Sequence, residues 1–263
     1  MAKRKRRKIS RKTERWLWLI LLAIGAGWIF YLMIYRKWED AAIVLPGGSE
    51  EVFGVKVPQG YPIHGIDVSS YQGQVNWQEL KATPAADVSL RFAFVKATEG
   101  LNDTDKMFVQ NWNQLRLSGI TRGAYHFFLA TKSGKQQALQ YIKQVTLRSG
   151  DLPPVIDIEK LYGVKPALMR ERVQEFLDMV EDYYQVKPII YTYADFYERY
   201  LGTAFDKYPL WVAHYFELQR PRVGRNWHFW QYTEGGKVNG VRGKVDCNLF
   251  NGDSVRFRQM LIR

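Results

Sequence analysis

The chain has 263 residues, of which 46% are hydrophobic and 15% aromatic, and this composition excludes intrinsic disorder over most of its length. Its formal net charge is +12, but the first fifteen residues supply +8 of it, because they hold nine Lys or Arg against the single acid Glu14. The chain is therefore not basic throughout. Its one cysteine, Cys247, excludes an intramolecular disulfide, and we expect this residue to be a small buried hydrophobe.

The segment after the basic head, residues 16–35, reads WLWLILLAIGAGWIFYLMIY and carries no charge. As a helix, its twenty residues are enough to cross a hydrocarbon core about 30 Å thick, and the span is longer than the apolar region of a cleaved signal peptide. Basic residues are concentrated before the segment, which places the N-terminus in the cytoplasm. We expect a basic cytoplasmic tail over 1–15, an uncleaved single-pass signal anchor over 16–35, and an exported domain, periplasmic or extracellular. The charge run then flanks a membrane segment, and we expect no nucleic-acid partner.

Residues 36–63 mix charges, the pair Gly47 and Gly48, and three prolines with little periodicity. This composition is typical of a linker, here a tether from the bilayer. We expect the folded domain to occupy residues 64–263.

Within that domain, short β-rich runs alternate with longer amphipathic stretches. The expected strands are 64–70, 91–97, 123–128, 153–159, 187–193, 210–215, 228–233 and 244–250. The expected helices are 105–118, 133–149, 166–184, 194–201 and 253–261. Four successive strand-then-helix units favour a mainly parallel sheet buried under helices, and the short late connections make it irregular. The predicted fold class is α/β, an irregular TIM-like (β/α) barrel preceded by the single transmembrane helix.

The strand PPVIDIE carries the strongest indication of chemistry. Side chains two apart on a strand point the same way, so Val155, Asp157 and Glu159 share one face. Two acids then project from the C-terminal end of a buried strand, which is the active-site end of a parallel barrel. Neighbouring carboxyls raise the pKa of one of them, and this provides the protonated acid beside an ionised partner that glycosidic cleavage requires.

Other predicted strands also end in acids. Asp67 lies in HGIDVSS, Glu99 closes KATEG, and Asp246 lies in GKVDCNLFNG. A single D-x-E is common and is more often a solvated strand end, but acids on four strand ends indicate one acidic cleft.

Aromatic residues lie on or beside the same strands, and their flat faces and polar tips suit sugar rings. About half of them are expected to pack in the core instead. The residues expected to bind substrate are Tyr125, Tyr191, Tyr193, Trp211, Tyr215 and Gln231.

The segments GIDVSSYQGQVNW, FVKATEG, GAYHFF, PVIDIE, IIYTY, LWVAHY and WQYTEGGKVNGVRGKVDCNLFNG together resemble, in order, the motifs of glycoside hydrolase family 25. These enzymes are the N-acetylmuramidases, or Chalaropsis-type lysozymes. The resemblance covers about residues 64–252 and implies a distorted (β/α) barrel that cuts the β-1,4 bond between N-acetylmuramic acid and N-acetylglucosamine in peptidoglycan. It places the family's acids on Asp67, Asp157, Glu159 and Asp246 and implies that Glu159 is the proton donor.

We therefore expect a lysozyme whose partner is the glycan strand of peptidoglycan, working without a metal or other cofactor. Glu159 would protonate the leaving oxygen, while Asp157 would either attack the anomeric carbon or orient the 2-acetamido group, whose oxygen then attacks. Side-by-side acids favour the second route.

Two other functions fit parts of the sequence. His64, His126 and His214 lie on predicted strands beside the acids, as in a metal-dependent polysaccharide deacetylase, although no close His pair is present. A non-catalytic protein that anchors peptidoglycan to the membrane would use the same tether and aromatic cleft, but it would not need an intact D-x-E.

Overall fold

The computed structural model describes residues 51–82 and 89–263. The basic tail, the expected signal anchor and the first part of the expected linker lie outside the described residues. Among the residues that are described, no helix is long and apolar enough to cross a membrane.

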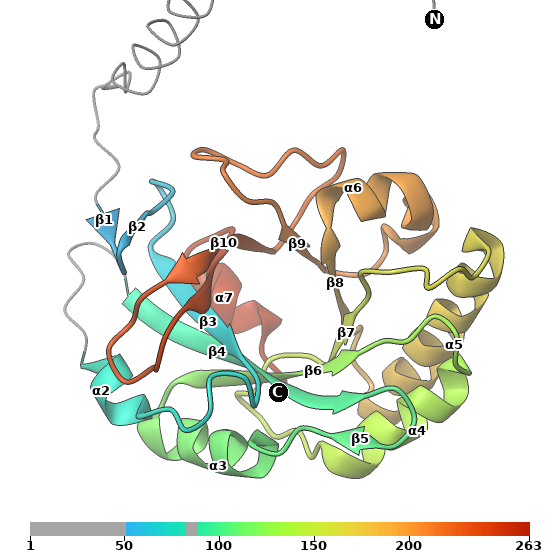
Figure 1. Cartoon of the computed structure of the whole chain (residues 1–263), viewed down its shortest axis with the longest axis horizontal. Helices are drawn as coiled ribbons and strands as arrows, with labels where there is room; N and C mark the ends of the chain where they lie inside the picture. Colours follow the sequence, from blue (N-terminus) through green and yellow to red (C-terminus); the bar gives the residue numbers. More distant parts are fainter. Residues whose placement is uncertain (1–50, 83–88) are drawn as a thin grey trace, which may run out of the picture. The chain divides into compact units, whose positions relative to one another are not determined.

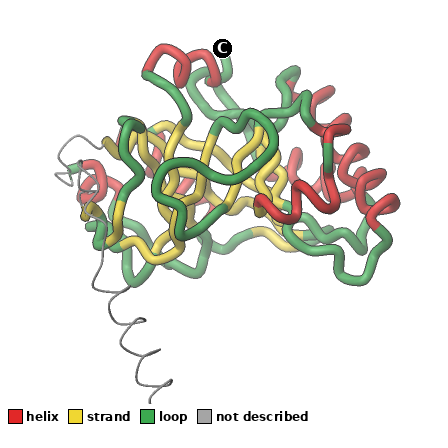
Figure 2. The backbone as a smooth tube through the Cα atoms, turned by 90° about the horizontal axis from the view of Figure 1, so that it is seen from above, coloured by secondary structure: helices red, strands yellow, loops and turns green. Residues whose placement is uncertain are grey.

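Eight strands close into a barrel at the centre of the domain (Figures 1 and 2). In chain order they are β3 (Ile63–Val68), β4 (Ser89–Glu99), β6 (Thr121–Phe127), β7 (Val155–Asp157), β8 (Ile189–Tyr193), β9 (Leu210–Ala213), β10 (Phe229–Gly236) and β11 (Val245–Phe250). The order around the ring is β3-β11-β10-β9-β8-β7-β6-β4, and β4 pairs again with β3. A two-residue strand, β5 (Asp103–Thr104), adds to the outer edge of β4. Each of the eight expected strands is therefore present.

The first seven barrel strands run parallel, and only β11 runs against its neighbours β10 and β3. The connection from β10 to β11 is a hairpin, residues 237–244, which is too short to carry the chain back for a parallel strand. The first residues of β11 therefore lie at the same end of the barrel as the last residues of the other seven. That end is called the mouth below.

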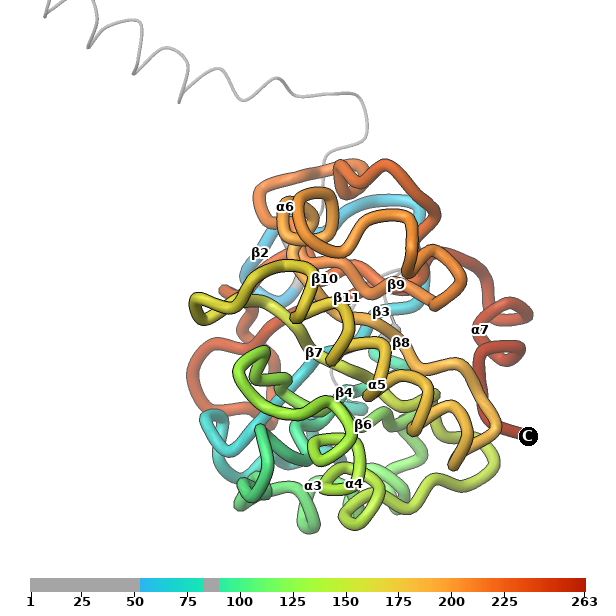
Figure 3. The backbone as a smooth tube through the Cα atoms, turned by 90° about the vertical axis from the view of Figure 1, so that its right-hand side faces the viewer, coloured from blue at the N-terminus to red at the C-terminus, as the bar shows by residue number. Residues whose placement is uncertain are grey.

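Helices cover the outside of the first half of the barrel. They are α2 (Trp77–Lys81), α3 (Phe108–Ser118), α4 (Gly134–Gln144) and α5 (Pro166–Tyr184), and Figure 3 shows α5 in front of the strands, with α3 and α4 at the lower edge. The second half has only α6 (Ala194–Phe196), a π-helical turn (Tyr197–Leu201), a 3-10 turn (Thr203–Phe205) and α7 (Ser254–Met260). The predicted irregularity of the barrel is therefore concentrated where the connections are short.

The barrel interior is filled by alternate side chains of the strands. Phe94 stacks on Trp211 with ring centroids 4.2 Å apart, and Phe92 lies edge-on to Phe229 at 5.2 Å. Phe257 of α7 contacts Phe92 at 5.8 Å from the end opposite the mouth. Because α7 closes that end, the strand-end side chains at the mouth are the ones left open to solvent.

The folded domain begins earlier than predicted. Residues of the expected linker form a hairpin of β1 (Glu51–Val52) and β2 (Val55–Lys56), whose turn places Phe53 at φ 60°. Phe53 and Val57 are buried in the core, and the Phe53 carbonyl accepts a hydrogen bond from the Lys237 N–H at 2.7 Å. Residues 51–63 are thus part of the domain, because two apolar side chains bury against the β10–β11 hairpin region despite the weak local pattern.

Candidate active site

The structure gathers the four predicted acids at the mouth. Asp67 is the fifth residue of β3 and lies directly across the antiparallel ladder from Asp246 on β11. Asp157 ends β7, and Glu159 follows two residues later. Ile156 and Ile158, which alternate with the two acids, pack outward in the layer under the helices, while Val155 packs in the barrel interior. The alternation predicted for this strand is therefore present, although its ladder stops at Asp157.

Asp67 is held by two side-chain amides. Its Oδ2 accepts hydrogen bonds from Gln231 Nε2 at 2.8 Å and from Asn248 Nδ2 at 2.7 Å. The Asn248 oxygen in turn accepts from the indole N–H of Trp211 at 2.8 Å. This N–H donor fixes which end of the Asn248 amide faces Asp67.

The Gln231 amide is fixed in the same way. Its Oε1 accepts from the hydroxyl of Tyr191 at 2.8 Å and from that of Tyr215 at 2.6 Å. Both amides therefore have their N–H groups directed at one carboxylate, and a carboxylate that accepts hydrogen bonds favours its ionised form. Asp67 is therefore a buried carboxylate whose two hydrogen-bond donors are already oriented toward it.

Burial and mutual charge raise the pKa values of all four acids. Burial, followed by the charge of Asp67, raises the pKa of Asp246 to about 9, and burial raises that of Asp67 to about 6 against the hydrogen bonds that lower it. Burial, followed by the charges of Glu159 and Asp67, raises the pKa of Asp157 well above its ordinary value. Burial also raises the pKa of Glu159, with Lys160 opposing the shift. The cluster therefore retains protons at neutral pH, as general acid catalysis requires.

Lys96 is a member of the site that sequence analysis missed. Its Nζ contacts Glu99 Oε2 at 2.5 Å and lies 4.9 Å from the centre of the Phe127 ring. Its charge lowers the pKa values of both Asp157 and Glu159, against burial. Strand alternation in the sequence could have identified it, because Lys96 lies two residues after the interior residue Phe94 and therefore also faces the barrel axis. Glu99 is present at the mouth as the partner of this lysine.

The expected substrate-binding residues fall into two groups. Tyr125, Tyr193 and Tyr215 are partly exposed at the mouth, where a ligand can reach them. Trp211 and Gln231, each 2% exposed, offer no face to a sugar and instead belong to the layer that orients the acids. Tyr191 is 5% exposed and has the same supporting role. Strand alternation places all six on the interior face but does not show how deep each one lies.

The three histidines do not join the acids. His64 Nε2 lies 2.6 Å from the Tyr61 carbonyl, and His126 Nδ1 lies 2.7 Å from Thr98 Oγ1. His214 Nδ1 accepts from the Arg222 N–H at 2.9 Å. Each histidine is an odd number of residues away from the interior-facing residues of its strand, so its side chain points away from the barrel axis. Within residues 51–82 and 89–263, no group of three or more His, Cys, Asp or Glu is arranged to hold a metal ion.

One acid oxygen at the mouth has no partner. Of the buried side-chain polar atoms in the part of the chain that is described, three have no hydrogen-bond partner, and Asp157 Oδ1 is one of them. A pocket of about 360 Å³ is lined by the neighbouring Tyr193 and Tyr215, although Asp157 is not among its lining residues. A buried polar atom without a partner gains most when a polar substrate group supplies its hydrogen bond.

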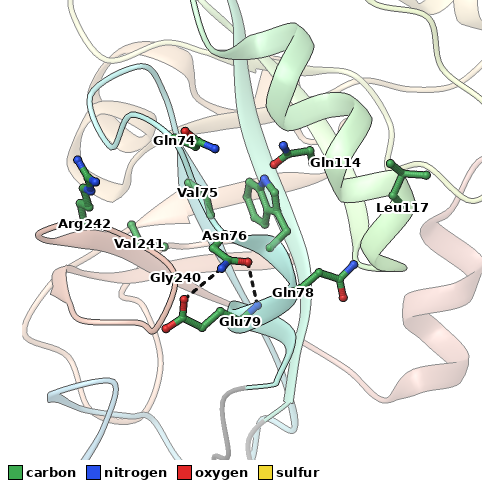
Figure 4. Close-up of a pocket in the computed structure, with 11 residues that line it drawn as sticks. Gln74, Val75, Asn76, Gln78, Glu79, Gln114, Leu117, Gly240, Val241 and Arg242 are labelled. Carbon is green, nitrogen blue, oxygen red and sulfur yellow. Dashed lines mark hydrogen bonds between the residues drawn. The ribbon is translucent and has the colours of Figure 1, made fainter.

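A larger pocket, about 730 Å³, lies on the flank of the barrel between α2, α3 and the 237–244 hairpin (Figure 4). Asn76 caps α2 there by accepting from the Glu79 N–H at 3.2 Å, and the Gly240 carbonyl accepts from the Asn76 N–H at 2.8 Å. The acids of the mouth do not line it. This pocket is therefore separate from the acids at the mouth.

Known proteins resemble this chain in both sequence and fold. The profile of Glycosyl hydrolases family 25 matches residues 66–241. Lysozyme M1 of Streptomyces globisporus is 35% identical over 226 residues, which cover 80% of this chain and 74% of that protein. The protein YegX of Escherichia coli strain K12, described as uncharacterized, is 42% identical over 200 residues, covering 76% and 74%.

A solved structure gives the same result for the fold. The family 25 glycosyl hydrolase of Bacillus anthracis superposes with a TM-score of 0.71 at 32% identity, covering 78% of this chain and 95% of that one. These similarities in sequence and fold show that the chain belongs to glycosyl hydrolase family 25.

Proposed function

We propose that this protein hydrolyses the β-1,4 bond between N-acetylmuramic acid and N-acetylglucosamine in peptidoglycan. One observation supports it above the others: Asp157 and Glu159 lie side by side at the open end of the barrel, and both have raised pKa values. Family membership supports the same reaction, and relatives such as Lysozyme M1 carry its name.

Glu159 is the general acid in this proposal. It is the more exposed of the pair, so its carboxyl can reach the glycosidic oxygen of a strand lying over the mouth. Burial raises its pKa, which keeps a larger fraction protonated near neutral pH than for a solvated glutamate.

Asp157 then orients the 2-acetamido group of the substrate. The greater burial of Asp157 favours keeping the shared proton there rather than on Glu159. A substrate N–H donated to the unpartnered Oδ1 stabilises the ionised form and moves the proton preference to Glu159. The acetamido oxygen, held in this way, attacks the anomeric carbon as Glu159 protonates the leaving oxygen, and water later opens the ring that forms.

The test uses full-length protein, purified peptidoglycan and mass spectrometry of the released fragments. Muropeptides with reducing N-acetylmuramic acid ends support the proposal, whereas reducing N-acetylglucosamine ends would replace it with a glucosaminidase. Binding without fragments would leave the non-catalytic anchor. Glu159→Gln should abolish release, while Glu171→Gln, the same change on the exposed face of α5, should not alter it.

We further propose that residues 16–35 anchor the enzyme in a membrane with the N-terminus in the cytoplasm. The uncharged twenty-residue segment and the nine basic residues before it support this. The full chain should stay with membranes after alkaline carbonate washing, and a variant beginning at residue 36 should not. Protease added outside should degrade the enzyme domain but not a tag at the N-terminus.

A further inference from the structure

Four aromatic side chains are strongly exposed in the described part of the chain: Tyr71 at 88%, Tyr162 at 45%, Tyr183 at 61% and Phe216 at 98%. Tyr183 lies near the end of α5, away from the mouth. The other three follow the C-terminal ends of β3, β7 and β9, so all three lie in loops at the mouth. Surface exposure of single apolar residues is ordinary, but its concentration at the catalytic end calls for a reason.

Two of these rings are held out by an unusual backbone. Tyr162 has φ 51° and Phe216 has φ 63°, in the left-handed region that bulky residues rarely adopt. Four residues other than glycine have positive φ within the described ranges, and these two are among them. A strained conformation that presents an apolar ring to water gains nothing for folding, and such conformations concentrate at binding sites.

The backbone that carries Tyr71 is fixed in a different way. The N–H of Ser69 donates to Gln72 Oε1 at 3.0 Å, and the N–H of Ser70 donates to Asp105 Oδ2 at 2.8 Å. The N–H of Tyr71 itself donates to Ser69 Oγ at 3.1 Å. Three consecutive backbone groups are therefore anchored below an exposed ring, so a ligand that stacks on it orders little additional backbone.

The three positions have a simple arrangement around the mouth. Along the ring of strands, β3 is three steps from β9 in one direction and three steps from β7 in the other. Tyr71 thus lies on one side, and Phe216 and Tyr162 flank β8 on the opposite side. A linear polymer that crosses the mouth over Glu159 meets Tyr71 on one side of the cleaved bond and the other two rings on the far side.

We propose that Tyr71, Tyr162 and Phe216 are stacking platforms for sugar rings of the glycan strand beyond the scissile bond. The apolar face of a sugar ring suits an aromatic ring, and rings separated around the mouth suit an extended strand better than a compact protein partner. This inference rests on the proposed function, and it adds that the enzyme prefers long glycan strands over short fragments.

The test compares the full-length protein with the triple variant Tyr71→Ser, Tyr162→Asn, Phe216→Asn. Asparagine tolerates positive φ, so the two strained loops keep their conformation without the rings. Tyr183→Ser is the control, because it removes an exposed ring whose 61% exposure lies within the range of the other three and which is away from the mouth. The substrates are peptide-free glycan strands, separated into fragments of two disaccharide units and strands of many units.

We expect kcat/KM of the triple variant to fall about tenfold or more on long strands and to stay unchanged on the short fragments, while the control matches the parent on both. Equal losses on both substrates, or no loss on either, would overturn the proposal. Co-sedimentation with insoluble peptidoglycan separates the two hypotheses. If the parent binds but releases no fragments, the proposed function fails, and loss of sedimentation in the triple variant still decides whether the platforms exist.

Discussion

Asp67 and Asp246 face each other across the antiparallel ladder of β3 and β11, and their carboxyl groups share a hydrogen bond. Two carboxylates that share a hydrogen bond cannot both be ionised at low cost, so one proton stays between them. Asp67 is the better anion, because Gln231 and Asn248 already donate to it. Asp246 is then the member that keeps the proton.

This pair predicts how stability changes with pH. The pKa of Asp246 is raised from 3.8 to about 9 on folding, so the folded state binds more protons than the unfolded state between those values. Its contribution to stability is full below about pH 4 and is lost as pH rises toward 9, at no more than about 1.4 kcal/mol per pH unit. Asp246→Asn mimics the protonated acid, and its melting temperature should fall less between pH 6 and pH 9 than that of the parent. Parallel curves would contradict the shared proton.

Trp211→Phe should impair catalysis by freeing the Asn248 amide. The ring is kept, but the N–H that orients Asn248 is lost, so Asp67 loses a fixed donor. We expect kcat to fall about tenfold with KM unchanged and stability to fall by about 1–2 kcal/mol. The matched control is Trp77→Phe, which removes an indole hydrogen bond to buried Asn111, away from the mouth. It should lose similar stability and keep its kcat, and an equal fall in kcat for both variants would refute the positioning role.

Lys96→Met should move the pH profile of activity upward. Lys96 lowers the pKa values of Asp157 and Glu159, so its removal raises both and shifts both limbs of the profile to higher pH. Lys160 is exposed and lowers the pKa of Glu159, whereas Lys96 acts on both acids, so Lys160→Met should shift only the limb that reports Glu159, and this shift should shrink at high salt. Profiles of kcat/KM at two salt concentrations check this. A profile that stays in place in the Lys96 variant would remove this residue from the site.

Substrate assistance predicts a chemical dependence on the acetamido group. In peptidoglycan with part of its muramic acid N-deacetylated, bonds on the reducing side of the altered sugar should remain uncut, because no acetamido oxygen is present to attack. Mass spectrometry of the limit digest would show deacetylated muramic acid inside fragments and never at their reducing ends. Its appearance at reducing ends would favour Asp157 as a direct nucleophile.

Several features followed from the sequence alone because they depend on local periodicity. The alternation in PPVIDIE placed Asp157 and Glu159 on one face, and all eight barrel strands and the bounds of α5 were predicted from pattern and breakers. Cys247 is buried, as expected of a lone apolar thiol. The expected membrane anchor lies outside the described residues and stays a proposal.

Other features depended on contacts between distant segments. The pairing of Asp67 with Asp246 exists because β11 turns back and closes the ring, and no local pattern determines which strand becomes its neighbour. Closure of the barrel also sets how deeply each interior residue is buried. Trp211 is therefore buried and orients Asn248, whereas Lys96 reaches the acids of the site. Local alternation determined which way each side chain points, and closure of the barrel decided what it meets there.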